Sequence, residues 1–327
     1  MFLALDSDER EIADAAADFL GNEFPLRRLH ETPEDPDNLA AFAGLGWLGL
    51  AAAEGAGGSA LSVVEEMLFF QEHGRVAGPM EVLFQVLAVA VTQDDEALCA
   101  SLIAGEATTA LLVQQGAAGE IRLVGSADAK FALRVQHDGA VLYSVNAAEL
   151  RKVPCLDRSV AMYMGSETCL ESRVAVGGSA VWQRALIAVA AMQVGLADSA
   201  LQMIVAYAKE RETFGRAIGS YQAVRHPCSD MAVRVEAARS QLFYAATALR
   251  EGHADAAMQV DAAKLLADKA ATLNTDANIQ LHGGIGVTDE LDAHLLLKRA
   301  NLLGRLFGSS KQLYGSLLDL DTDQGGV

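Results

Sequence analysis

The stretch MAVRVEAARSQLFYAATALREG, residues 231–252, decides the fold of this chain. Its apolar residues recur in alternating steps of four and three. They are Met231, Val235, Ala238, Leu242, Ala245 and Leu249. This spacing places them on one face of an α-helix, as in the seam of a helical bundle. Residues 187–208 repeat a similar spacing, Gly252 is typical of a helix end, and Asp255 can cap the next helix. We therefore expect about three to five long antiparallel helices to form a bundle over residues 179–327.

Residues 1–105 also predict helices. Ser7 is a candidate N-cap, because carboxylates follow it in the first turn, where they suit the helix dipole. Apolar residues from Leu61 to His73 recur at helical spacing, and Gly74 is a plausible stop. The glycine run 55–58 has no strand before it, so we interpret it as a loop rather than a phosphate-binding turn.

Residues 106–178 change to short segments rich in β-branched and aliphatic residues. Five of them are candidate strands: 111–113, 121–124, 131–135, 141–145 and 160–164. Asp138-Gly139 between two of them is a hairpin signal. A small antiparallel sheet or barrel is expected here. The predicted fold is therefore mainly α with a small β domain, divided into residues 1–105, 106–178 and 179–327.

Composition excludes several classes of function. Hydrophobic residues make up 51% of the 327 residues and charged ones 21%, which is typical of a globular protein. The net charge of -18 argues against binding to nucleic acid or to an anionic membrane. The four cysteines lack metal-ligand spacing and resemble reduced cytosolic residues, so we predict no metal site and a cytoplasmic location. The acidic N-terminus does not resemble a signal peptide.

Two short motifs carry the candidate chemistry. The first is Arg211-Glu212-Thr213-Phe214-Gly215 with Gln222, and the second runs from Gln280 through His282 to Gly283-Gly284. An Arg guanidinium matches a diphosphate, a Thr hydroxyl can donate to the same anion, and a Gly-Gly pair lets a ligand approach the backbone. Taken singly, each residue also has a structural interpretation. Arg211 could complement the dipole at a helix C-terminus, and Phe214 could anchor a core.

Together, these motifs resemble those of the acyl-CoA dehydrogenase family. YAKERETFGRAIGSYQAVRHPCSDMAVRVEAAR, residues 207–239, is similar to a signature region of that family. QLHGGIGVTDE, residues 280–290, is similar to its Gln-x-x-Gly-Gly motif. Residues 44–78 resemble its N-terminal helical domain. The resemblance implies a helical N-terminal domain, a small β domain and a C-terminal four-helix bundle that forms the centre of a dimer or tetramer.

The resemblance also implies FAD as the cofactor, bound across a dimer interface. Positions matching the family residues that reach the FAD of the neighbouring protomer are Arg211, Thr213, Phe214, Gln222, Gln280, Gly283 and Gly284. These residues would form one half of a flavin site, offered in trans. The β domain lacks the Thr-Glu-Pro-type run and the Trp-centred strand that usually complete the site.

No catalytic residue is identified. Removal of the α-proton of an acyl thioester needs a positioned carboxylate. The family position for that Glu, counted from Ala300, falls on Phe307. The alternative position on an earlier helix falls in residues 180–186, and no carboxylate lies between Ser172 and Ala197. His282 and His226 are interpreted as structural.

This pattern predicts a short, base-lacking subunit of a heteromeric acyl-CoA dehydrogenase, of the actinobacterial type with steroid or long acyl-CoA substrates. A longer partner would bring the Glu in a heterotetramer, and an electron-transfer flavoprotein or a similar acceptor would take the electrons. Two alternatives remain open: a homomeric enzyme (dimer or tetramer) with an unplaced base, and a non-enzymatic scaffold. The two hypotheses differ in whether the pure chain binds flavin.

Overall fold

The structure is a computed structural model that describes residues 5–31, 38–115, 119–126 and 128–324. It contains two compact units. The bundle unit comprises Met1–His30, Met67–Gly78 and Leu186–Val327, and the sheet unit comprises Glu31–Glu66 and Pro79–Ala185. The predicted fold class, mainly helical with a β middle region, is confirmed.

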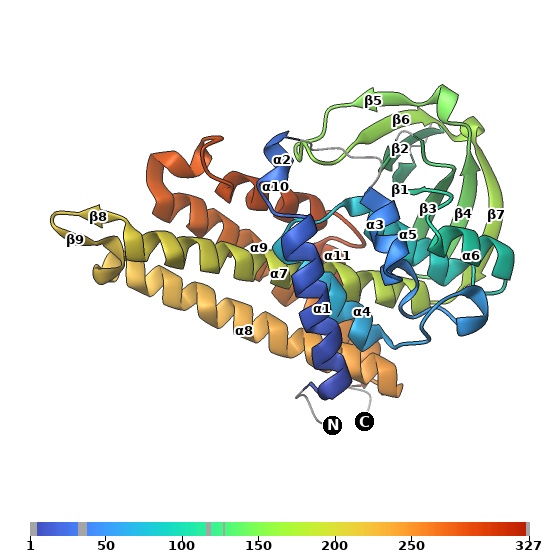
Figure 1. Cartoon of the computed structure of the whole chain (residues 1–327). Coiled ribbons are helices and arrows are strands. Elements are labelled where there is room, and N and C mark those ends of the chain that lie inside the picture. The colour runs from blue at the N-terminus through green and yellow to red at the C-terminus, as the bar shows by residue number, and fades with distance from the viewer. Residues whose placement is uncertain (1–4, 32–37, 116–118, 127, 325–327) are drawn as a thin grey trace. The chain divides into compact units, whose positions relative to one another are not determined.

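Long helices dominate the bundle unit (Figure 1). Those that follow the sheet in sequence are α7 (Ala180–Glu210), α8 (Gln222–Glu251), α9 (Ala256–His282), α10 (Ala293–Leu303) and α11 (Ser310–Gln324), of which α7 begins in the sheet unit. The predicted seam of α8 is buried from Met231 to Ala245, and Leu249 is half-buried. Gly252 ends α8 in the left-handed conformation, as expected. Asp255 occupies the N-cap of α9, but its carboxylate accepts from the Gln259 side chain at 2.8 Å rather than from the backbone.

Helix α7 is long and apolar enough to cross a membrane by length and composition alone. However, 83% of its most apolar window is buried within the protein. Such burial is the arrangement of a core helix in a bundle, so the composition of α7 is explained by packing.

Two helix-end predictions were wrong by small steps. Helix α1 (Ser7–Glu23) is capped by Asp6 rather than Ser7, because Asp6 and Glu9 form a reciprocal capping box. Helix α4 (Val63–Arg75) continues through Gly74. A Cβ at Gly74 would lie 2.1 Å from the carbonyl oxygen of Met192, and a Cβ at Gly195 would lie 2.0 Å from that of Gln71. Glycine at position 74 therefore permits close contact between α4 and α7 instead of ending a helix.

The sheet unit contains α3 (Asn38–Gly44), α5 (Met80–Val91), α6 (Glu96–Ile103) and the start of α4, together with a seven-stranded sheet. Its strands are β1 (Thr109–Gln115), β2 (Glu120–Val124), β3 (Phe131–Gln136), β4 (Gly139–Val145), β5 (Arg151–Val153), β6 (Met162–Ser166) and β7 (Leu170–Gly177). The order is β5-β6-β2-β1-β3-β4-β7. All five predicted strands are present, and β3 and β4 form the predicted hairpin.

The expected antiparallel pairing holds for the described sheet except between β1 and β3. After the β1–β2 hairpin the chain returns to the free edge of β1, so that β3 pairs with β1 in parallel. Strands β5 and β7 were not predicted. Strand β5 has three residues, and most of β7 is exposed or half-exposed, so neither shows the apolar alternation of a half-buried strand.

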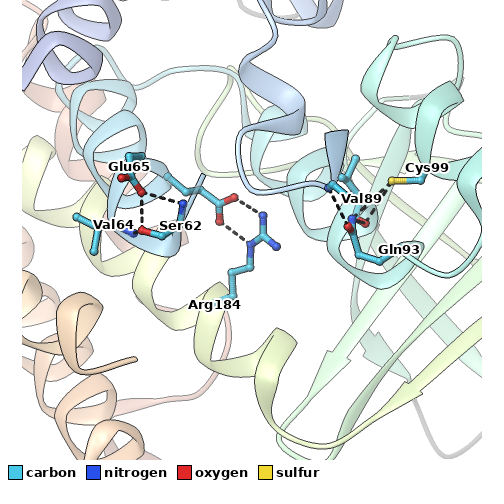
Figure 2. Close-up of polar contacts among 9 residues, drawn as sticks. Ser62, Val64, Glu65, Val89, Gln93, Cys99 and Arg184 are labelled. Carbon is cyan, nitrogen blue, oxygen red and sulfur yellow. Dashed lines mark hydrogen bonds and ion pairs between the residues drawn. The ribbon is translucent and has the colours of Figure 1, made fainter. Parts of the chain in front are cut away.

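A buried ion pair links two helices within the sheet unit. Figure 2 shows Arg184, near the start of α7, with its side chain directed toward α4. There it binds the carboxylate of Glu66. Its Nε donates to Oε1 of Glu66 at 2.7 Å, and Glu66 is only 2% exposed. Burial disfavours the charged guanidinium, but the Glu66 carboxylate outweighs it and raises the pKa of Arg184.

Candidate functional site

The first motif forms a hairpin between α7 and α8. Arg211 follows the last residue of α7, and strands β8 (Glu212–Thr213) and β9 (Arg216–Ala217) pair on either side of a two-residue turn. Phe214 and Gly215 both have positive φ, +51° and +77°. Such a turn favours Asn or Gly at the first position, so Phe214 is strained there. Figure 1 shows the hairpin projecting beyond the ends of α7 and α8.

The tip of this hairpin is open to solvent. Phe214 is 99% exposed within the chain, more than any other large apolar residue among those described. A large ring held outward in a strained conformation does nothing for the stability of the chain itself. The Phe214 ring is therefore accessible to contact from outside this chain.

The second motif forms the end of α9 and the turn after it. Gln280 and His282 lie in the last turn of α9, and Gly283 has φ +69° and ψ −146°, a conformation that essentially only glycine adopts. The short helix η6 (Gly283–Val287) begins there. A Cβ at Gly283 or Gly284 would meet nothing within 4 Å, so the backbone faces open space.

The structure brings the two motifs to one end of the bundle unit. The rings of Tyr207 and His282 lie 4.4 Å apart between centroids, joining the last turn of α7 to the last turn of α9. The Arg211 backbone N–H donates to the Tyr207 carbonyl at 2.8 Å, so Arg211 lies one turn beyond this contact. Gln222 begins α8 directly after the hairpin. The predicted cofactor residues thus cluster at the ends of α7, α8 and α9.

Four of the predicted cofactor residues have polar side chains that lack a partner within the described part of the chain. Among the described residues, nothing forms a hydrogen bond or ion pair with the side chains of Arg211, Thr213, Gln222 or Gln280. The local charge also differs from that of the whole chain. Residues 207–226 carry four cations, Lys209, Arg211, Arg216 and Arg225, against the carboxylates Glu210 and Glu212, in a chain of net charge -18. The hairpin and the start of α8 therefore carry a small local excess of positive charge, which favours an anion there.

These features fit a dinucleotide cofactor. A free guanidinium and a free hydroxyl can bind a diphosphate, and the open backbone at Gly283 and Gly284 admits close approach. Among the residues that the structure describes, no group of three or more metal-ligating side chains occurs. None of the four cysteines forms a disulfide bond.

His282 has the contacts of a structural residue. Its Nδ1 lies 2.7 Å from the Asn278 carbonyl oxygen, which accepts a hydrogen bond from the ring. Burial lowers the pKa of His282, although the hydrogen bond to Asn278 opposes that shift. The ring is therefore neutral near pH 7. His226 is exposed in the second turn of α8.

The predicted position of the base is filled by a phenyl ring. Phe307 lies between α10 and α11, has φ +53° and is 8% exposed. The sequence has no Asp or Glu between Asp292 and Asp319. On the other predicted stretch, residues 180–186, the nearby carboxylate is Glu66, which the sequence search missed because it lies 118 residues away. Its two oxygens are both bonded to Arg184, so Glu66 is a counter-ion rather than a free proton acceptor.

The described chain thus combines an N-terminal helical region, a mixed sheet and a set of C-terminal helices. This chain belongs to the acyl-CoA dehydrogenase family: the model of its C-terminal domain matches residues 179–315 and that of its N-terminal domain matches residues 6–94. Family members are FAD-dependent flavoproteins. The family resemblance in the sequence is therefore confirmed.

Acyl-CoA dehydrogenase FadE34 of Mycobacterium tuberculosis is 31% identical over 285 residues, which cover 83% of this chain and 40% of FadE34. The match thus spans less than half the length of that relative. The Tcur3481-Tcur3483 steroid ACAD is similar in structure, with a TM-score of 0.84 at 24% identity over 98% of this chain and 99% of that one. The ChsE4-ChsE5 complex of Mycobacterium tuberculosis gives 0.82 at 20% identity over the full length of both chains. These two likenesses concern the fold.

Proposed function

We propose that this chain is a subunit of an FAD-dependent acyl-CoA dehydrogenase that supplies the trans half of the flavin site and lacks the catalytic base. One observation carries the proposal. The polar side chains of Arg211, Thr213, Gln222 and Gln280 have no partner among the described residues, whereas the position that the family resemblance assigns to the base is Phe307, which is buried and unable to accept a proton.

Each residue of the bundle end would have its own role toward FAD. The Arg211 guanidinium and the Thr213 hydroxyl would donate to the diphosphate, and the backbone at Gly283 and Gly284 would lie against it. Gln222 and Gln280 would contact the adenosine side, and Phe214 would cover an apolar part of the cofactor in the neighbouring chain. FAD, when bound, supplies the acceptor for the β-hydride of the substrate.

The remaining chemistry would come from a second, longer chain. That partner would contribute the carboxylate that takes the α-proton of an acyl-CoA thioester, together with the rest of the flavin pocket. Two observations support a heteromeric enzyme of the steroid or long acyl-CoA type. Structural neighbours include a steroid ACAD named as a pair and the ChsE4-ChsE5 complex. An electron-transfer flavoprotein or a similar acceptor would reoxidise the cofactor.

The proposal is tested by the substitution Arg211→Ala in the chain co-purified with its partner. Loss of a charge-assisted hydrogen bond costs about 1.5–3 kcal/mol. We therefore expect FAD to bind roughly ten- to a hundredfold more weakly, measured by flavin fluorescence titration. Arg27→Ala is the matched control, because Arg27 is an exposed arginine outside both motifs. Unchanged flavin retention in Arg211→Ala would reject the assignment.

A further inference from the structure

The hairpin that carries Arg211 and Thr213 is too small to hold its own shape. Strands β8 and β9 have two residues each. An isolated hairpin is marginally stable at best in water, even when it is longer. The positive φ of Phe214 adds strain, which persists only where the surroundings enforce it. Contacts outside the ladder must therefore hold the turn.

Tyr221 provides contacts to both strands. Its hydroxyl donates to the Thr213 carbonyl on β8 at 2.9 Å. Its ring faces the guanidinium of Arg216 on β9, with the Arg216 Cζ 3.9 Å from the ring centroid. Thr213 and Arg216 are partners across the ladder, the pair next to the turn. A single side chain thus contacts both residues of that pair.

The position of Tyr221 is itself fixed. It is the N-cap of α8, and its carbonyl accepts from the backbone of Val224 and of Arg225, each at 3.0 Å. Ahead of it, the Ile218 N–H donates to the Arg211 carbonyl at 2.8 Å and closes the base of the hairpin. Because Tyr221 is fixed at the start of a thirty-residue helix, its ring holds the hairpin in one orientation relative to that helix.

Stacking leaves the donors of Arg216 available. A guanidinium that lies over an aromatic ring uses its face, while its N–H groups point outward in its own plane. Among the described residues, no carboxylate or carbonyl accepts from the exposed Arg216 side chain. Arg216 is thus an oriented cation without an anionic partner, five residues from Arg211.

We infer that Tyr221 is a positioning residue that holds Arg216 as a second cation for the diphosphate of the cofactor, beside Arg211. The inference rests on the proposed function of the hairpin and extends it by one phosphate-binding residue and its support. It identifies the ligand group as a diphosphate because two guanidinium groups and the Thr213 hydroxyl lie on one short hairpin.

The test compares four variants in the complex co-purified with the partner chain. Arg216→Gln removes the charge, Tyr221→Phe removes only the hydroxyl, Tyr221→Leu removes the ring, and the fourth combines Tyr221→Leu with Arg216→Gln. We expect FAD affinity to fall about tenfold in Arg216→Gln and in Tyr221→Leu, and about threefold in Tyr221→Phe. The double variant should bind FAD about as weakly as Arg216→Gln alone, because residues in contact are not additive.

The salt dependence of FAD binding separates this role from a merely structural one. A cation that contacts phosphate adds to the decrease of affinity with ionic strength. Arg216→Gln and Tyr221→Leu should both flatten that dependence, and Tyr221→Phe should keep it because the ring remains. Hydrogen exchange at the hairpin amides of the full chain should be faster in Tyr221→Leu than in Tyr221→Phe.

Two results would overturn the inference. One is wild-type affinity and salt dependence in Arg216→Gln, and the other is full additivity in the double variant. Arg211→Ala distinguishes failure of this inference from failure of the proposed function. If Arg211→Ala weakens FAD binding while the Arg216 and Tyr221 variants match the wild type, the inference is wrong and the proposed function stands. If none of them changes flavin retention, both are wrong.

Discussion

The bundle unit contains two Phe-Gly turns with the same backbone handedness and opposite surroundings. In Phe214-Gly215 the φ values are +51° and +77°, and in Phe307-Gly308 they are +53° and +100°. Phe214 is 99% exposed, whereas Phe307 is 8% exposed. One turn presents its ring outward beside free polar side chains, and the other turns its ring into the protein at the place where the family resemblance puts the base.

We interpret the difference as one between a ring that stabilises the fold and a ring that is available to a partner. The packing of the buried Phe307 ring within the chain offsets the backbone strain of its turn. The exposed Phe214 ring gains no packing within the chain, so we expect its contribution in an assembly. On this account, the Phe214 turn contacts a flavin site in the neighbouring chain, and the Phe307 ring packs in the interior of this one.

The largest expected effect is on catalysis. The pure chain supplied with FAD should give no reduction of an acceptor dye by acyl-CoA, because general base catalysis alone contributes about 10²–10⁴ in rate. The complex with the partner chain should restore turnover. Robust turnover by the pure chain would break the comparison and favour the homomeric alternative. Glu66→Gln would then be the first variant to assay, since Glu66 is the buried carboxylate beside residues 180–186.

A second prediction compares the two rings directly in the chain alone. Phe307→Ala should lower the free energy of unfolding by about 3–5 kcal/mol, since it empties a buried site. Phe214→Ala should change it by no more than about 0.5 kcal/mol, as for an exposed residue. Urea unfolding followed by circular dichroism measures both, and each variant is the control for the other. Equal losses of unfolding free energy would show that the exposure of the two rings does not determine what they contribute to stability.

A smaller effect concerns pH. Burial lowers the pKa of His282 below its ordinary value of 6.5, so the unfolded chain binds the proton more readily than the folded one. The stabilisation that depends on a neutral His282 is complete above that ordinary value. It decreases as the pH falls from there toward the lowered pKa of the folded state.

His282→Leu should reduce the pH dependence of urea unfolding as the pH falls below the ordinary histidine pKa of 6.5. The reduction should be partial, because burial also lowers the pKa of His294. An unchanged pH dependence in His282→Leu would show that the ring beneath the Gly283 turn is not held neutral by burial.

Local features of the sequence predicted the bundle well. The seam of α8 and the stop at Gly252 depend on residues in consecutive turns of one helix, so their spacing in the sequence is enough to predict them. The β3–β4 hairpin is local as well. Pairing of β1 with β3, and the contact of Gly74 with Met192, depend on chain segments that meet only in the folded protein. A glycine in a helical pattern signals either a stop or a close approach, and sequence spacing does not separate the two.

The candidate site shows the same division. The family resemblance predicted residues such as Arg211 and Gly283, and the structure gathers them at one end of the bundle. The ion pair of Glu66 with Arg184 and the stacking of Arg216 on Tyr221 had no signal in the motifs. The first joins distant segments, and the second depends on the turn that folds β9 back over the start of α8.

The central claim is that this chain brings half of a flavin site. Light scattering combined with flavin counting on the co-purified complex tests it most directly. The chain should self-associate when purified alone, exchange into a mixed complex when its partner is supplied, and then carry one FAD for each unlike pair. One FAD for each chain would contradict the half-site account, even though the chain belongs to the acyl-CoA dehydrogenase family.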